Sequence, residues 1–239
     1  MIKELIRNTL QFLHLDLTKN LEYDRLTKKI LNEVLDADSN TIDVGCHKGE
    51  ILQIILKKSP NGEHYAFEPI PAYFEALKRN FSGRAKIYPY ALSDQNGITV
   101  FQHVKNAPAF SGIKKRKYLI ENPDIEEIEV QMKILDDVVD PEKKIDLIKI
   151  DVEGGELAVL KGGRILIKKQ KPIIIFECGL GASEYYGTSS SEIHQFICNE
   201  SGMKISTLLS YVKKGKPLTE MEFEKSFNSN SDYYFVAHP

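Results

Sequence analysis

The sequence predicts an α/β fold in which a helical N-terminal extension precedes a doubly wound, mostly parallel sheet of seven strands. From residue 41 onward, short apolar strands alternate with amphipathic helices, which is the pattern of consecutive βαβ units. Residues 146–150 and 173–176 are nearly continuous apolar runs, typical of strands buried on both faces of a parallel sheet. Together these observations predict one sheet with helices on both of its faces.

The individual elements follow from the same alternation. Strands are expected at residues 41–44, 64–68, 86–90, 146–150, 173–176, 204–209 and 233–237. Helices are expected at residues 50–58, 71–81, 155–161, 164–169 and 191–201. Residues 213–230 contain Gly215 and Pro217 and are expected to form a loop between the last two strands.

The N-terminal residues also carry a helical pattern. Their apolar positions 2, 5, 6, 10 and 13 follow helical spacing. We therefore expect residues 1–40 to form a helical extension that packs on the domain of residues 41–239. A helix lying on a membrane surface is the alternative.

One segment interrupts the alternation of strands and helices. Residues 94–97 form a turn signal, and residues 98–101 read as a strand that leaves the third strand in a hairpin. Basic residues then dominate up to residue 118, and acidic residues dominate residues 121–129. We expect residues 103–130 to form a lid or substrate-binding insertion, with a solvated surface excursion as the alternative.

Composition restricts the class of protein. The 239 residues carry a net charge of −2, whereas a protein that mainly holds phosphate backbones is normally far more basic, so no stable nucleic-acid partner is expected. The three cysteines are too few and too scattered for a disulfide framework, which favours a reducing compartment and a cytoplasmic location. No apolar run reaches the 18 or so residues that a transmembrane segment needs.

The turn after the first strand is a candidate ligand-binding loop. Gly45 and Gly49 allow a tight turn and a close backbone approach at the helix N-terminus, where α/β folds bind their ligands. The pattern D-x-G-x-x-x-G, which begins at Asp43, lacks the middle glycine of the dinucleotide fingerprint. It also lacks the Gly-Lys-Ser/Thr ending of a Walker loop, so it does not predict a phosphate site.

Two acidic residues refine the expected ligand. Glu68 ends the second strand, close to the spacing at which an acid accepts hydrogen bonds from both ribose hydroxyls. Asp43 can receive the ammonium group of an amino acid or orient the glycine loop. A nucleoside joined to an amino acid, without phosphate, satisfies both acids, and S-adenosylmethionine is such a molecule.

Five sequence blocks resemble the FkbM family of S-adenosylmethionine-dependent methyltransferases. They are IDVGCHKGE (42–50), AFEPIPAYFEALKRN (66–80), YALSDQNGITVF (90–101), DLIKIDVEGGELAVLKGG (146–163) and KPIIIFEC (171–178). The fourth block is the most specific, because IDVEG followed by a glutamate is the family's signature. The resemblance implies a Rossmann-like class I methyltransferase fold.

The resemblance also implies cofactor-binding residues. In order along the chain they are Asp43, Gly45, Cys46, His47, Gly49, Glu68, Pro69, Ile70, Ala91, Leu92 and Ser93. Glu68 would hold the ribose hydroxyls, and the residues of the third strand's end would flank the adenine. The family usually has Ala-Asn where this chain has Cys46-His47, so His47 would replace an amide at this point.

Acidic residues at the next two strand ends are the candidate catalytic groups. Asp151 and Glu153 directly follow the fourth strand of the sheet, and Glu177 ends the fifth. If the methyl acceptor is a hydroxyl, a base must remove its proton as the new bond forms. Helix capping by Asp151 and a dipole interaction for Glu153 are the structural alternatives. Two such acids can also bind a divalent cation, but no third ligand stands out in the sequence and no metal is predicted.

We therefore expect O-methylation of a hydroxyl on a sugar, glycan or secondary metabolite. The basic run 114–117 would favour an acceptor that carries phosphate or carboxylate. A nicotinamide-dependent oxidoreductase is the rival enzyme class, and a non-catalytic binding module that keeps the fold is a third reading.

Overall fold

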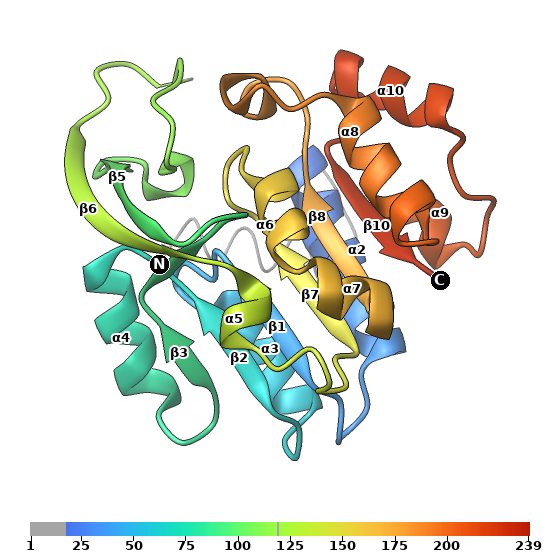
Figure 1. The fold of residues 1–239 in the computed structure, drawn as a ribbon, viewed down its shortest axis with the longest axis horizontal. Coiled ribbons are helices and arrows are strands. Elements are labelled where there is room, and N and C mark those ends of the chain that lie inside the picture. Colours follow the sequence, from blue (N-terminus) through green and yellow to red (C-terminus); the bar gives the residue numbers. More distant parts are fainter. Residues whose placement is uncertain (1–17, 119) are drawn as a thin grey trace.

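The structure, a computed structural model, describes residues 18–118 and 120–239. The helix expected near residues 2–13 lies outside these residues. The described chain forms a seven-stranded sheet with strand order β3-β2-β1-β7-β8-β10-β9, together with a separate three-stranded sheet of order β4-β6-β5 (Figure 1). The prediction of a mostly parallel sheet of seven strands is confirmed.

Six of the seven strands run in the same direction, and only β10 is antiparallel to its two neighbours, β8 and β9, in this described sheet. The strands of this sheet are β1 Thr41–Val44, β2 His64–Phe67, β3 Lys86–Tyr88, β7 Leu147–Ile150, β8 Ile173–Glu177, β9 Lys204–Thr207 and β10 Tyr234–His238. Every residue of β1, β2 and β7 is buried, as the apolar runs predict for central strands covered on both faces.

Helices cover both faces because successive strand residues point to opposite sides. Ile148 and Ile174 pack with α6, α7 and α10, whereas Leu147 and Ile175 pack with α2 and α3. The helices are α2 Lys19–Val34, α3 Glu50–Lys58, α4 Pro71–Phe81, α5 Leu135–Val138, α6 Glu156–Gly162, α7 Arg164–Gln170, α8 Ser190–His194, α9 Leu208–Val212 and α10 Glu220–Ser229. None of the described helices is both long and apolar enough to cross a membrane.

The predicted insertion forms part of the second sheet. Its strands are β4 Tyr90–Leu92, β5 Gly97–Val104 and β6 Ile125–Lys133, and β5 and β6 pair antiparallel along eight residues. The strand expected at residues 86–90 is therefore divided: β3 stays in the main sheet and β4 starts the second one. Residues 105–124 connect β5 to β6 and include the short 3-10 helix η1 Pro108–Phe110. Figure 1 shows this second sheet beside the carboxyl ends of β1 and β2.

The expected loop over residues 213–230 is wrong in its second half, where α10 forms. Thr219 caps this helix, and Glu222 completes a capping box by reaching back to the Thr219 backbone. Phe223 and Phe227 lie one turn apart and are both buried against the sheet. The glycine and proline therefore mark only the turn that precedes this helix. The strand expected at residues 204–209 likewise ends at Thr207, which caps α9.

Candidate active site

A cavity lies where β1, β2 and β7 end, beside the second sheet. It is lined by the loop after β1, the end of β2, the end of β4, the residues after β7 and the connection between β5 and β6. Of the predicted site residues, it brings together Asp43, Gly45, Cys46, His47, Glu68, Pro69, Ile70, Ala91, Leu92, Asp151 and Glu153. The carboxyl edge of a parallel sheet is where such folds bind their ligands.

The loop after β1 is packed against the loop after β7. Gly45 has a φ of +74°, and a Cβ atom at this position would lie 1.9 Å from the carbonyl oxygen of Asp151. The Asp151 backbone N–H in turn donates to the Val44 carbonyl at 3.1 Å. Any side chain at residue 45 would therefore displace Asp151. Gly49 does not line the cavity and is instead the N-cap residue of α3, close to Leu77 and Phe81 of α4.

Glu68 is a buried carboxylate that is already fixed by two backbone groups. Its Oε2 accepts from the His47 N–H at 2.8 Å, and its Oε1 accepts from the Ile70 N–H at 2.9 Å. Each oxygen keeps a lone pair for a further donor. Burial raises the pKa of Glu68 to about 7, partly offset by these two hydrogen bonds. A pair of vicinal hydroxyls can therefore approach a rigid carboxylate.

His47 and Cys46 fill the positions at which the chain departs from the family pattern. His47 adopts a φ of +49°, and its ring contacts the Tyr73 ring edge-on at 4.6 Å between centroids. Burial lowers the pKa of His47, so its imidazole is neutral near pH 7. The Nε2 atom has no hydrogen-bond partner among the described residues. Cys46 is buried, and burial raises the pKa of its thiol, so it is not a nucleophile.

Asp43 lies at the centre of the sheet with an unexpected partner. It is fully buried, and neither carboxylate oxygen accepts a hydrogen bond from the described residues. Its neighbour in register on β7 is Lys149, whose Nζ lies 4.0 Å from Asp43 Oδ1 and 3.1 Å from Asp151 Oδ2. The same ammonium lies 3.4 Å from the Gly45 carbonyl oxygen. Lys149 thus links both acids to the glycine loop.

The charge states of Asp43, Lys149 and Asp151 follow from burial and from the contacts that Lys149 makes with both acids. Burial raises the pKa of Asp43 to about 6 in spite of Lys149. For Lys149, burial alone would lower the pKa, but the carboxylates of Asp151 and Asp43 hold it above its ordinary value. Burial would raise the pKa of Asp151, yet Lys149 and the Tyr234 hydroxyl lower it below its ordinary value. Lys149 and Asp151 are therefore both charged at neutral pH.

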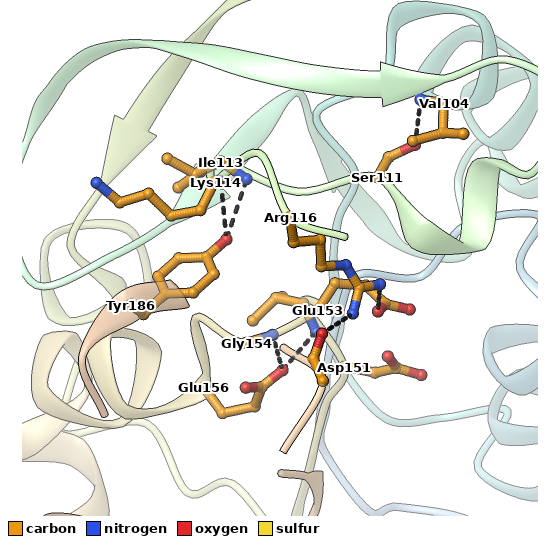
Figure 2. A network of polar contacts seen from close by, with 12 residues as sticks. Val104, Ser111, Ile113, Lys114, Arg116, Asp151, Glu153, Gly154, Glu156 and Tyr186 are labelled. Carbon is orange, nitrogen blue, oxygen red and sulfur yellow. Dashed lines mark hydrogen bonds and ion pairs between the residues drawn. The ribbon is translucent and has the colours of Figure 1, made fainter. Parts of the chain in front are cut away.

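The three candidate catalytic acids converge. Carboxylate oxygens of Asp151, Glu153 and Glu177 all lie within 4.8 Å of one another, although Glu177 does not line the cavity itself. Burial and the Asp151 charge raise the pKa of Glu153 to about 8 and that of Glu177 well above its ordinary range. The Arg116 guanidinium pairs with Glu153, so this acidic group already has a positive partner (Figure 2).

Glu156 shapes the turn that carries Glu153. Its Oε1 accepts from the backbone N–H of Val152 at 3.1 Å and from that of Gly154, also at 3.1 Å. Figure 2 shows Glu156 beside Gly154. These two bonds stabilise a turn in which Glu153 has a φ of +59° and Gly154 a φ of +109°. A non-glycine residue in this region is strained, and such strain is found at functional sites. The glutamate of the signature block thus supports the turn rather than lining the cavity.

The connection between β5 and β6 is tied down over the acidic group. Tyr186 accepts from the Ile113 and Lys114 N–H groups at 3.1 and 3.3 Å (Figure 2). Tyr185 accepts from the Lys117 N–H at 3.1 Å. Arg116 also donates to the Gly181 carbonyl at 3.0 Å, so this basic residue faces inward while Lys114 and Lys117 are exposed. The uniform basic run therefore divides into one buried guanidinium and exposed lysines.

The residues expected around an adenine ring are divided between two cavities. Pro69, Ile70, Ala91 and Leu92 line the first cavity. Ser93 instead lines a neighbouring cavity, and its backbone N–H donates to the Lys133 carbonyl at 2.9 Å. The second sheet therefore turns Ser93 away from the first cavity.

Sequence reasoning missed Lys149 and Tyr234, and it placed Arg116 in a basic run facing the substrate without its pairing to Glu153. Lys149 had a signal, because it is a charged residue inside the apolar run of a central strand. Arg116 and Tyr234 come from elements 37 and 83 residues away from the acids that they contact. Nothing in the local pattern around these two residues indicates those contacts.

The strand order, with β10 antiparallel to both neighbours, is that of a Rossmann-like methyltransferase fold. A family model described as the methyltransferase FkbM domain matches residues 43–204, from β1 to the start of β9. The chain therefore belongs to the FkbM methyltransferase domain family. A solved structure of an FkbM methyltransferase from Methylobacillus flagellatus KT supports the fold, with a TM-score of 0.53 and 16% identity over 85% of this chain and 44% of that one.

Curated relatives are also methyltransferases. The chain is 26% identical to the 2-O-methyltransferase NoeI of Sinorhizobium fredii (strain NBRC 101917 / NGR234), covering 62% of this chain and 66% of NoeI. It is 29% identical to the methyltransferase sdnD of Sordaria araneosa, covering 51% of this chain and 59% of sdnD. The chain thus spans slightly under two thirds of the length of these relatives.

S-adenosylmethionine is the cofactor that this family membership implies, and the cavity fits it. Asp43 offers a buried carboxylate whose oxygens have no hydrogen-bond partner among the described residues. Gly45 lets the loop after β1 pack directly against Asp151 at the cavity wall, and Glu68 keeps acceptor capacity for two hydroxyls. Ile70, Ala91 and Leu92 supply apolar walls for a purine ring.

Proposed function

We propose that this protein is an S-adenosylmethionine-dependent methyltransferase that methylates a hydroxyl on a sugar, glycan or secondary metabolite. The observation that carries the proposal is the Glu68 carboxylate, buried at the end of β2 and fixed by two backbone N–H groups beside the glycine loop. A ribose without a neighbouring phosphate suits this arrangement. The glycine pattern offers no dinucleotide cradle that would favour a nicotinamide cofactor.

The cofactor would supply an electrophilic methyl group, and the protein would supply position and a base. Methyl transfer is an in-line displacement, so its rate depends on holding donor and acceptor in close alignment. Asp151 is the proposed base, because Lys149 and Tyr234 keep it ionised at the cavity wall. Glu177, whose pKa is raised well above its ordinary range, is proposed to be protonated at neutral pH, and Glu153, held by Arg116, is proposed to orient the acceptor together with Glu177.

Two observations bear on the proposed methyl acceptor: the name of one relative and the positions of the basic residues 114–117. NoeI is named as a 2-O-methyltransferase, which favours transfer to a hydroxyl oxygen. Among the basic residues 114–117, Arg116 already pairs with Glu153, and the three lysines are exposed. An anionic group on the acceptor would therefore meet the exposed lysines rather than Arg116, and Lys114 lines the neighbouring cavity. The free thiols of the three cysteines fit the proposed cytoplasmic location.

Calorimetric titration with S-adenosylhomocysteine tests the cofactor assignment. Wild-type protein is expected to bind it with micromolar affinity. Glu68→Ala is expected to weaken binding about 100-fold, because two charge-assisted hydrogen bonds are lost. Glu75→Ala, an exposed glutamate of α4, is the control and should bind like the wild type. Equal binding by the Glu68 variant, or binding of NADH instead, would contradict the proposal.

A further inference from the structure

The hydroxyl of Tyr234 lies against Asp151, although β10 follows β7 by more than 80 residues. It donates to Asp151 Oδ2 at 2.7 Å. Tyr234 begins β10 and pairs in antiparallel register with Glu177 of β8. Its ring also contacts the Tyr23 ring of α2 at 5.2 Å between centroids. Strand pairing and ring packing therefore hold the phenol in place next to the acid.

The Lys149 ammonium lies against the same oxygen atom, at 3.1 Å. A carboxylate oxygen has two lone pairs, so the two donors occupy Oδ2. The Glu177 carboxyl is a further hydrogen-bond partner of Asp151. With Oδ2 occupied, an acceptor hydroxyl would approach Oδ1. Lys149 itself is held by Asp43 and the Gly45 carbonyl, so it has little freedom to move away.

We propose that Tyr234 is a positioning residue for methyl transfer: together with Lys149 it holds Asp151 Oδ2, so that Asp151 Oδ1 is presented to the acceptor hydroxyl. The inference rests on the proposed function, because it gives Asp151 the role of base. The proton of the acceptor hydroxyl passes to Oδ1 as the oxygen attacks the methyl carbon, and the carbon–sulfur bond breaks with its electron pair leaving on sulfur. Tyr234 touches neither substrate nor cofactor in this step and acts only through Asp151.

The charges around Asp151 make this hydrogen bond measurable. The titratable and charged groups that interact with Asp151 come from every surrounding element: Lys149 on β7, Glu177 on β8, Glu153 in the following turn with its partner Arg116, Glu156 on α6, Asp43 on β1, His47 in the loop after β1 and Tyr234 on β10. The acids Asp43, Glu153 and Glu156 disfavour the Asp151 anion, whereas the hydrogen bond from Glu177 favours it, as do Lys149 and Tyr234. Each donor to the Asp151 anion therefore matters. Loss of the Tyr234 hydroxyl should therefore raise the pKa of Asp151.

The chain offers a matched control in the preceding residue. Tyr233 is also a partly buried tyrosine, but its hydroxyl donates to Asn20 Oδ1 at 2.5 Å. Tyr233→Phe removes a hydroxyl of the same kind from the same strand end without touching Asp151. Both variants keep their aromatic ring, so packing against Tyr23 is retained.

The experiment is a carboxyl-carbon NMR titration of the full chain labelled at aspartate, with Asp151→Asn to assign the signal. In Tyr234→Phe the Asp151 midpoint is expected to rise by about one pH unit, which corresponds to one hydrogen bond to a charged group. It should not move in Tyr233→Phe, and both variants should bind S-adenosylhomocysteine like the wild type. Tyr234→Met, which also lacks the hydroxyl, replaces Tyr234→Phe if that variant does not fold.

The outcomes separate this inference from the proposed function. An Asp151 midpoint that is the same in the wild type and in Tyr234→Phe would overturn the positioning role. Failure of S-adenosylhomocysteine to bind any of the proteins would instead count against the methyltransferase assignment, and the titration would still report on the Tyr234 hydrogen bond. A kinetic signature follows once an acceptor is found: Tyr234→Phe should lower kcat about tenfold with little change in KM.

Discussion

At the scale of single residues, Glu68 links cofactor binding to pH. Its pKa of about 7 arises from burial, and ribose hydroxyls bind best to the ionised carboxylate. We predict that the affinity for S-adenosylhomocysteine falls about tenfold per pH unit below pH 7. Titrations at pH 6, 7 and 8 test this, and Glu68→Gln, which cannot ionise, should bind weakly with no such slope. A slope that persists in Glu68→Gln would assign the pH dependence to another group.

The same raised pKa has the opposite effect on folding. The folded protein holds a proton on Glu68 up to about pH 7, whereas the unfolded chain releases it near the ordinary value of 4.5. The contribution of this group to stability is therefore fully present below pH 4.5 and is lost as the pH rises through 7. As the pH rises from 4.5 to about 7, cofactor affinity is therefore expected to increase, while the contribution of Glu68 to the stability of the cofactor-free protein decreases.

Gly45 shows how closely two loops approach in this site. Gly83 has the same φ of +74° but has nothing within 4 Å of an added Cβ, whereas at Gly45 that atom meets the Asp151 carbonyl at 1.9 Å. We predict that Gly83→Ala costs about 1 kcal/mol of unfolding free energy, from backbone conformation. Gly45→Ala should cost about 3 kcal/mol and also weaken cofactor binding, because Asp151 must move. Urea denaturation and calorimetry test both variants, and equal losses would mean that the clash is relieved cheaply.

At the scale of elements, the connection between β5 and β6 depends on Arg116. Its guanidinium pairs with Glu153 and lies over the rings of Phe110 and Tyr118, at 5.4 and 6.0 Å from their centroids. Removing the charge leaves residues 113–117 held by the backbone hydrogen bonds to Tyr185 and Tyr186. Local opening should therefore become more frequent.

Trypsin can measure this opening, since residues 114–117 are all lysine or arginine. We predict that Arg116→Gln raises the rate of cleavage in this run about tenfold, in line with the loss of one charged hydrogen-bonded pair. Lys115→Gln is the control: it also removes one cleavage site, but residue 115 is exposed, and its cleavage rate should not rise. Unchanged cleavage in Arg116→Gln would mean that the tyrosine contacts hold the segment by themselves.

At the scale of the whole molecule, the sequence predicts the strands, the helices and the residues at strand ends. It does not predict contacts between segments that are far apart in the chain. Alternating apolar strands and helices predict the sheet, and motifs at strand ends place Asp43, Glu68 and Asp151 near one another, because parallel strands end at a common edge. The contacts of Tyr234 and Arg116 depend on how the last strand and the insertion return to that edge. No local pattern encodes such a return.

Helix α2 of the N-terminal extension contacts the start of β10, next to Tyr234. The Tyr23 hydroxyl of α2 donates to Asp232 at 3.2 Å and accepts from the Tyr233 N–H at 3.3 Å, directly before Tyr234. Leu26 of the same helix is 1% exposed and packs in a cluster shared with the central strands. We propose that α2 is a structural part of the methyltransferase domain.

Leu26→Ala should then lower the unfolding free energy by about 3 kcal/mol, as expected for a cavity in a packed core. Lys29→Ala on the exposed side, where the ion pair to Glu33 spans 3.9 Å, should change it by less than about 0.5 kcal/mol. Urea denaturation followed by circular dichroism gives both values. A single transition with an unchanged slope would mean that α2 unfolds together with the sheet. A loss below 1 kcal/mol for Leu26→Ala, or a separate early transition, would instead make α2 an appendage that Tyr234 and the active site do not need.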